Sequence, residues 1–368
     1  YARRFVDPAM GFAIGWNYWL NWAVTLAVEV IAGALIMKFW FPDVPAVVWS
    51  GIFIVVLFIL NYLSTRAYGE GEYIFASIKV GMVLLFLVLG VLLITGVIGG
   101  SSPGTSNWTT GDAPFVGGAG SVIAISMIAA FSFQGTELIG IAAGESENPH
   151  KAVPKAIHNV FWRILLFYIG TMIVIGFLLP YTDPSLLHTD VESVAVSPFT
   201  LALDRTGFPA AASLVNFVIL TAVLSGGNSG LYASTRMLYA MAEAGEAPKC
   251  FAKVNKRGVP INALLLTTAF GFLAFLSSLI GDGTAYQWLM QLSGMTGFVV
   301  WLGIAVCHYR FRRAFKAQGL SLDVLPYRAS CFPFGVYLAL ILCTIVIVGQ
   351  NYAAFTGSEV DWGGVIST

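Results

Sequence analysis

The stretch Phe131-Ser132-Phe133-Gln134-Gly135-Thr136-Glu137 lies inside an apolar run that extends from about residue 119 to about residue 142. A run of this length can cross the roughly 30 Å hydrocarbon core of a bilayer as a helix. Polar groups and irregular backbone at that depth are tolerated only where they are buried in protein or line a cavity. The stretch therefore predicts a membrane helix broken at its centre, whose ends present free backbone N–H and C=O groups to a ligand.

The composition of the whole chain indicates a polytopic membrane protein. Of its 368 residues, 57% are hydrophobic and only 10% are charged, and the formal net charge is zero. Mean hydropathy is +0.80. A soluble domain carries about 25% charged residues, and nucleic-acid binding needs a basic surface. Both classes are therefore excluded, as is a disordered chain.

Nine apolar segments are long enough to cross a bilayer as helices. None shows the alternating pattern of a membrane β-barrel, so we expect an all-α fold that forms a single domain over residues 1–368. The expected spans are about 11–38, 46–64, 73–98, 119–142, 159–180, 208–240, 260–280, 286–308 and 333–351.

The distribution of Lys and Arg predicts the orientation of these spans. When the spans are followed in order, 16 of the 19 Lys and Arg residues fall on one side. The N-terminus of this chain is therefore expected in the cytoplasm and, after nine crossings, its C-terminus outside. Many acidic residues, Asp190 among them, fall on the outer side and predict a negative vestibule that attracts cations.

Three charged side chains are clear cases of a charge inside an expected span, where a charge costs about 2.5–3.5 kcal/mol and therefore suggests function. Glu29 shares one helical stripe with Tyr18 and Trp22, so this face is expected to line the bundle or a cavity. Lys79 either extends to the nearer membrane surface or is buried and able to exchange a proton. Glu137 belongs to the predicted break.

Two further motifs surround these charges. Glu145 follows Glu137 close to the expected cytoplasmic end of the same span. In the sixth span, Ser225-Gly226-Gly227-Asn228-Ser229-Gly230 offers small residues for close helix packing, and hydroxyls that can bind a cation. The alternative interpretation of this motif is helix packing alone.

Enzymatic and metal chemistry have no support in the sequence. The four histidines lie in loops or at span ends, and the four cysteines have no metal-ligand spacing. Neither an HExxH nor a GxSxG motif lies in a span. We therefore expect no metal, no cofactor and no enzyme activity.

Several motifs resemble the amino-acid permeases of the amino acid–polyamine–organocation superfamily. They are Gly15–Trp22, Phe131–Pro149 and Ser225–Tyr239. Other stretches are similar to the bacterial lysine permeases of this family, namely Phe161–Tyr168, Pro180–Leu187, Ser197–Leu201 and Cys307–Arg313. The resemblance covers essentially the whole chain.

This resemblance implies a twelve-helix transporter built from two inverted five-helix repeats and two trailing helices. The nine spans would be its third to eleventh, so that the first two and the twelfth are absent. The glycine-rich broken first helix, which contributes to the substrate site, would be missing with them. We therefore expect this chain alone to insert poorly and to bind no lysine.

The resemblance also implies a function, which is import of L-lysine with a proton by alternating access across the bacterial inner membrane. Membrane lipid is then a partner, and nucleic acid is not. The implied substrate contacts are Tyr18, Trp22, Phe131 as a gate, the main chain from Ser132 through Phe133 and Gln134 to Gly135, and the acidic residues Glu137, Glu145 and Asp190. The implied proton-coupling residues are Lys79, Glu29, Ser225 and Ser229.

Two alternatives remain open at this point. The motifs are shared with relatives, so the substrate could be arginine, an aromatic amino acid or a broad range of amino acids. The chain could also be a lysine sensor that signals to a regulatory membrane partner. Uptake by purified protein in liposomes separates a transporter from a sensor.

Overall fold

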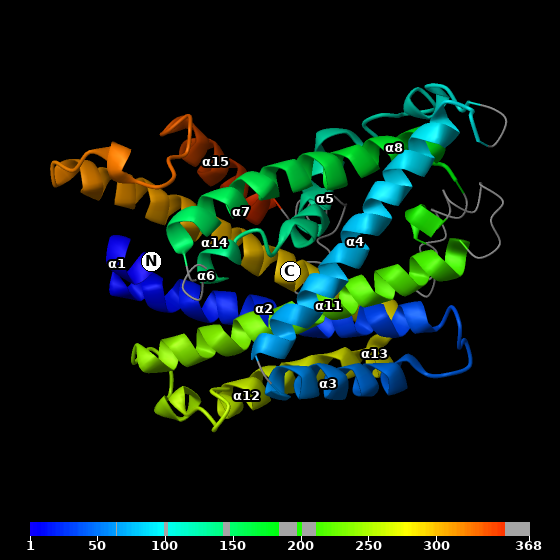
Figure 1. Cartoon of the computed structure of the whole chain (residues 1–368). Helices are drawn as coiled ribbons and strands as arrows, with labels where there is room; N and C mark the ends of the chain where they lie inside the picture. The colour runs from blue at the N-terminus through cyan, green and yellow to red at the C-terminus, as the bar shows by residue number, and fades with distance from the viewer. Residues whose placement is uncertain (64, 99–101, 143–147, 184–196, 201–210, 350–368) are drawn as a thin grey trace, which may run out of the picture.

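The computed structural model describes residues 1–63, 65–98, 102–142, 148–183, 197–200 and 211–349. Within these ranges every regular element is a helix and there is no strand, which confirms the predicted all-α class. Seven helical segments of this part of the chain are long and apolar enough to span a bilayer. Figure 1 shows them as a bundle of long rods. The inverted repeat implied by the resemblance stays a prediction.

The helices follow the order of the expected spans. The long ones are α2 (Pro8–Met37), α3 (Ala46–Leu63), α4 (Thr65–Ile94), α5 (Gly118–Phe133), the run α7 (Pro149–Arg163), η3 (Ile164–Gly170) and α8 (Thr171–Leu178), α11 (Ala211–Glu243), the run α12 (Ile261–Gly271), η6 (Phe272–Leu276) and α13 (Ser277–Ile280), α14 (Asp282–Ala317), and α15 (Phe334–Gly349). Short helices are α1 (Ala2–Phe5), η1 (Ser106–Trp108), α6 (Ile139–Ala142), η5 (Lys249–Ala252) and η7 (Leu322–Val324).

Several helices extend beyond the apolar segments that predicted them. The run that contains α7 begins at Pro149 instead of about 159, and α14 continues to Ala317 instead of about 308. Hydropathy detects only apolar turns, whereas backbone hydrogen bonding continues through polar ones. Proline is suited to the first turn of a helix, so Pro149 marks the start of α7. By contrast, α5 and α15 have only 16 residues each.

Helix α2 forms the core of the bundle. It packs against α11, α14, α3 and α12, and most of its length is buried. Asp7 caps its N-terminus by accepting a 2.8 Å hydrogen bond from the backbone N–H of Met10. Small residues such as Ala23, Ala27 and Gly33 allow neighbouring helices to approach closely. The side chains of α2 are therefore fixed in place, including those of the site described below.

The outer faces of the bundle are apolar. Val55 and Ile59 of α3, Val88 of α4, and Ile341 and Val348 of α15 are all exposed. Soluble monomers rarely expose apolar surface on this scale, and lipid tails provide its natural environment. Helix α4 crosses the bundle obliquely and packs against α11 (Figure 1). This crossing places one of the intramembrane charges, Lys79, beside the small residues of α11.

Candidate functional site

The predicted break is present between α5 and α6. Helix α5 ends at Phe133 and α6 begins at Ile139. Gly135 has a φ of +90°, a region that glycine adopts far more readily than other residues. A methyl group at Gly135 would lie 3.6 Å from Trp22, an ordinary contact. The glycine is therefore required by its backbone conformation and not by lack of space.

The carboxylate of Glu137 is held by four hydrogen-bond donors. Its Oε1 accepts from the Tyr18 hydroxyl of α2 at 3.2 Å and from the backbone N–H of Gly135 at 3.3 Å. Its Oε2 accepts from the indole N–H of Trp301 of α14 at 3.2 Å and from the Thr136 hydroxyl at 3.5 Å. The charge predicted to mark the break is thus fixed between α2, α14 and the break itself.

The side chain of Gln134 anchors the break to the two neighbouring helices. Its amide nitrogen donates to the carbonyl of Ser293 of α14 at 2.7 Å, and its amide oxygen accepts from the Ser293 and Thr25 hydroxyls at 3.3 and 3.4 Å. Asn21 of α2 donates to the same carbonyl and to Thr296 of α14, at 2.7 and 2.9 Å. In this state, therefore, Gln134 already has protein partners.

The aromatic stripe predicted on α2 reaches the break. Trp22 is 4% exposed and packs edge-on against Tyr18, with ring centroids 6.3 Å apart. The Trp22 indole N–H is buried and has no hydrogen-bond partner. Its ring lies against Gly230 of α11, where an added methyl group would come within 3.1 Å. The ring is therefore confined between the break and α11.

The other side chains of the predicted motif point in different directions. Phe131 is half-buried and packs against the core around α2. Phe133 stacks on Tyr168 of the π-helical segment η3, with centroids 4.7 Å apart. Ser132 is exposed. Only the main chain of Ser132 and Phe133 was expected to contact substrate, and these side-chain positions leave that expectation open.

Two cavities meet at the break. One has a volume of about 620 Å³ and the other about 930 Å³, and both are lined by Thr136 and Glu137. Sites for small molecules usually have about 300–1,000 Å³. The larger cavity extends along α2, α11 and α14 from Tyr18 to Arg3 and Arg236. Glu137 is therefore accessible from a space large enough for an amino acid.

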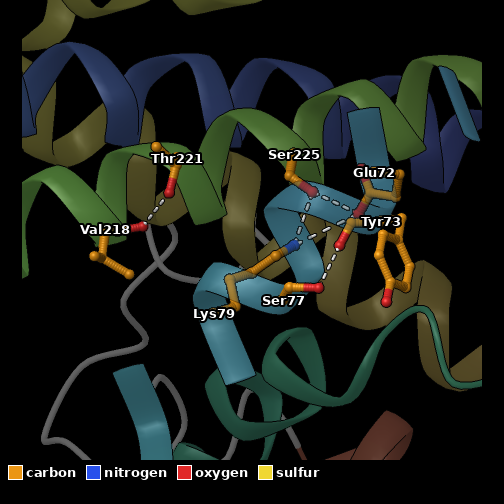
Figure 2. Close-up of polar contacts among 7 residues, drawn as sticks. All are labelled: Glu72, Tyr73, Ser77, Lys79, Val218, Thr221 and Ser225. Carbon is orange, nitrogen blue, oxygen red and sulfur yellow. Dashed lines mark hydrogen bonds and ion pairs between the residues drawn. The ribbon is translucent and has the colours of Figure 1, made fainter. Parts of the chain in front are cut away.

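Lys79 lies in a second polar cluster, where α4 crosses α11 (Figure 2). Its amine donates to the hydroxyl of Ser225 at 2.7 Å and lies 3.5 Å from Oε1 of Glu72. The Ser225 hydroxyl donates in turn to the same oxygen of Glu72 at 2.5 Å. Ser225 is fully buried, and the two charged side chains are about 70% buried. Lys79 is thus paired within the protein, with Ser225 and Glu72.

Glu29 faces the same part of α11 from the opposite side. A methyl group added to Gly226, the neighbour of Ser225, would lie 2.7 Å from Oε1 of Glu29. Glu29 also interacts electrostatically with Lys79. Ser229, one turn further along α11, has a partner of its own. The structure therefore brings Lys79, Glu29 and Ser225 together.

Two predicted site residues, Glu145 and Asp190, lie outside the described residues. Several contributors were absent from the prediction, among them Trp301, Ser293 and Glu72. Glu72 precedes Lys79 by seven residues, which places both on one helical face. That spacing could have identified it, had the expected span not begun at residue 73. Among the described residues, no group of three or more His, Cys, Asp or Glu is placed to hold a metal.

A broken membrane helix beside a cavity, with charged groups buried nearby, is typical of secondary transporters. The family model described as amino acid permease matches residues 1–367. The chain belongs to this family, as its motifs had indicated, and is a multi-pass membrane transporter and not an enzyme.

Three similar bacterial proteins are permeases named for a single amino acid. The chain is 55% identical to the lysine-specific permease LysP of Escherichia coli K12 over 369 residues, which cover all of this chain and 76% of that protein. It is 50% identical to the lysine-specific permease LysP of Lactococcus lactis over 95% of the chain and 70% of that protein. The histidine permease HisP of Lactococcus lactis is 48% identical over 99% of the chain and 76% of that protein.

Proposed function

We propose that this permease imports L-lysine together with a proton, by alternating access across the bacterial inner membrane. Two relatives that are 50% or more identical to the chain are named lysine-specific permeases. The observation that carries the proposal is Glu137, a carboxylate at the helix break that faces both cavities. The N-terminus of the chain is assigned to the cytoplasm because most Lys and Arg residues would then lie inside.

Lysine fits this site through charge. Its side-chain ammonium carries three donors, and charge-assisted hydrogen bonds are stronger than those of neutral donors. The ammonium can therefore replace the Tyr18 hydroxyl, a neutral donor to Glu137 in this state, while the Trp301 indole N–H keeps the carboxylate in position. The backbone groups freed between Gln134 and Leu138 would hold the α-amino and α-carboxyl groups, as half-helix ends do in other transporters.

Proton coupling is assigned to the cluster around Lys79. The largely buried Lys79 ammonium, bonded to Ser225, ties α4 to α11, and loss of its proton removes a charge that holds them. A lysine whose environment changes as the cavity opens can give up and regain a proton, because its charged form depends strongly on solvation. The proton gradient would then drive accumulation of the substrate.

A second candidate function is transport of a broader range of amino acids. The histidine permease is nearly as similar to the chain as the lysine permeases are, and general amino-acid permeases of yeasts are 40% identical. The same binding site would then accept neutral or other cationic side chains.

Uptake of radiolabelled lysine into proteoliposomes tests the proposal. We expect accumulation only when a proton gradient, acidic outside, is imposed. Unlabelled lysine should compete fully, whereas glutamate should not compete because Glu137 would repel its carboxylate. Equal competition by histidine and neutral amino acids would favour the broader permease. Accumulation without a gradient would contradict proton symport.

A further inference from the structure

Glu72 occupies a position that neither the motifs nor the proposed substrate site explains. It lies on α4 seven residues before Lys79, and its Oε1 accepts a hydrogen bond from the Ser225 hydroxyl (Figure 2). Lys79 donates to the oxygen of that same hydroxyl. The three groups therefore form a directed chain of hydrogen bonds, from the Lys79 amine through the Ser225 hydroxyl to the Glu72 carboxylate.

The second oxygen of Glu72 adds an independent observation. Its Oε2 is buried and has no hydrogen-bond partner. A buried charged oxygen without a partner is unfavourable, and this penalty falls when the carboxyl group takes up a proton. Oε2 of Glu72 is therefore a position where a proton could bind without displacing another hydrogen bond.

The charged surroundings of Lys79 come from three helices. Glu72 lies on α4 itself, Ser225 comes from α11, and Glu29 faces Lys79 from α2. Tyr286 of α14 faces Glu29. Lys79 thus interacts electrostatically with two carboxylates, of which Glu72 is joined to it through a hydroxyl.

We propose that Glu72 exchanges the coupling proton with Lys79 through the Ser225 hydroxyl, an assignment that rests on the proposed proton symport. In this step an N–H bond of the Lys79 ammonium breaks, and that proton binds the Ser225 oxygen. The original Ser225 proton moves at the same time to Glu72. The products are a neutral amine, an unchanged hydroxyl and a neutral carboxylic acid, so atoms and charge balance.

This exchange connects a proton to helix movement. Before it, an ion pair and two short hydrogen bonds hold α4 to α11. After it, both charges are gone and only neutral contacts remain, so the two helices separate more easily. Separation of the two helices can then release the proton from Glu72 without first breaking an ion pair.

The test uses Glu72→Gln, which keeps the size of the side chain but cannot carry the proton, and Ser225→Ala, which removes the relaying hydroxyl. Ser77→Ala is the matched control, because Ser77 is exposed on the same helix and bonds only to the carbonyl of Tyr73 (Figure 2). Each protein is reconstituted in liposomes. Gradient-driven lysine accumulation and lysine counterflow, which needs no net proton movement, are measured in parallel.

We expect Glu72→Gln and Ser225→Ala to lose accumulation at least about tenfold while counterflow stays within about twofold of the parent. Glu72→Asp, which can still carry a proton, should recover part of the accumulation. The inference is overturned if Glu72→Gln accumulates lysine as the parent does, or if it loses accumulation and counterflow equally while still folded. Should Glu72→Gln fail to fold, Ser225→Ala decides by the same criteria. If lysine accumulation by the parent protein does not depend on the proton gradient, the proposed symport is overturned instead.

Discussion

The carboxylate of Glu137 receives hydrogen bonds from α2, from α14 and from the break, so its charge can be removed with little change of shape. In Glu137→Gln, the new amide group would direct N–H donors at either the Trp301 indole or the Tyr18 hydroxyl. We expect lysine uptake to fall more than tenfold, a loss of at least about 1.4 kcal/mol. Glu243→Gln, at the exposed end of α11, is the control. Normal uptake by folded Glu137→Gln would show that Glu137 has a structural role and does not bind the substrate through its charge.

Trp301 should act on the substrate through Glu137. Trp301→Phe keeps an aromatic ring but removes the N–H that bonds to Oε2 at 3.2 Å. Hydrogen bonds to charged groups contribute about 1.5–3 kcal/mol, so we expect the KM for lysine to rise about tenfold or more. Trp49→Phe is a matched control, because the Trp49 indole N–H has no partner to lose. An unchanged KM in Trp301→Phe would show that Thr136 and Gly135 suffice to position the Glu137 carboxylate.

At this scale the sequence predicts which residues lie at the break better than it predicts their hydrogen-bond partners. Tyr18 and Glu137 were both expected at the site, the first from its helical stripe and the second from the cost of a membrane charge. Trp301 and Ser293 were not, because an aromatic residue or a serine in an apolar helix carries no signal of its own. Their roles depend on which helices pack together, and contacts between residues so far apart in sequence leave no periodic pattern.

At the scale of elements, the break is the feature that depends most on a single residue. Gly135→Ala places a side chain at a φ of +90°, which costs roughly 1–2 kcal/mol. We expect a lower melting temperature in detergent and reduced lysine uptake, because Gln134 and Glu137 would both be displaced. Gly81→Ala, at an exposed position of α4 with open space around it, should leave both unchanged. Equal behaviour of the two variants would contradict this role of Gly135.

The positions of the elements could be predicted from hydropathy, whereas their ends could not. The expected span at 73–98 corresponds to α4, which begins at Thr65, and this difference excluded Glu72 from the predicted charges. The break itself was predictable because five polar or glycine residues in six positions cannot remain helical in lipid without partners. Its hydrogen bonds to α2 and α14 could only be seen in the structure.

At the scale of the whole molecule, the proposed symport makes the charge of Lys79 the link between proton binding and the contact of α4 with α11. Lys79→Ala removes the ammonium that bonds to Ser225 and Glu72, so we expect proton-driven accumulation of lysine to be lost. Lys79→Arg should fail as well, because arginine keeps its charge at every accessible pH and cannot release a proton. Accumulation in proteoliposomes under an imposed gradient measures both effects.

Counterflow separates the coupling role of Lys79 from a purely structural one. Exchange of lysine across the membrane needs the cavity to open to both sides but needs no net proton transfer. Counterflow should therefore survive in part in whichever of Lys79→Ala and Lys79→Arg keeps the helices correctly packed. Retained accumulation in both variants would show that the proton carrier lies elsewhere, with Glu29 and Glu137 as the next residues to substitute. The loss of counterflow together with folding, measured by thermal unfolding, would show instead that Lys79 mainly stabilises the contact between α4 and α11.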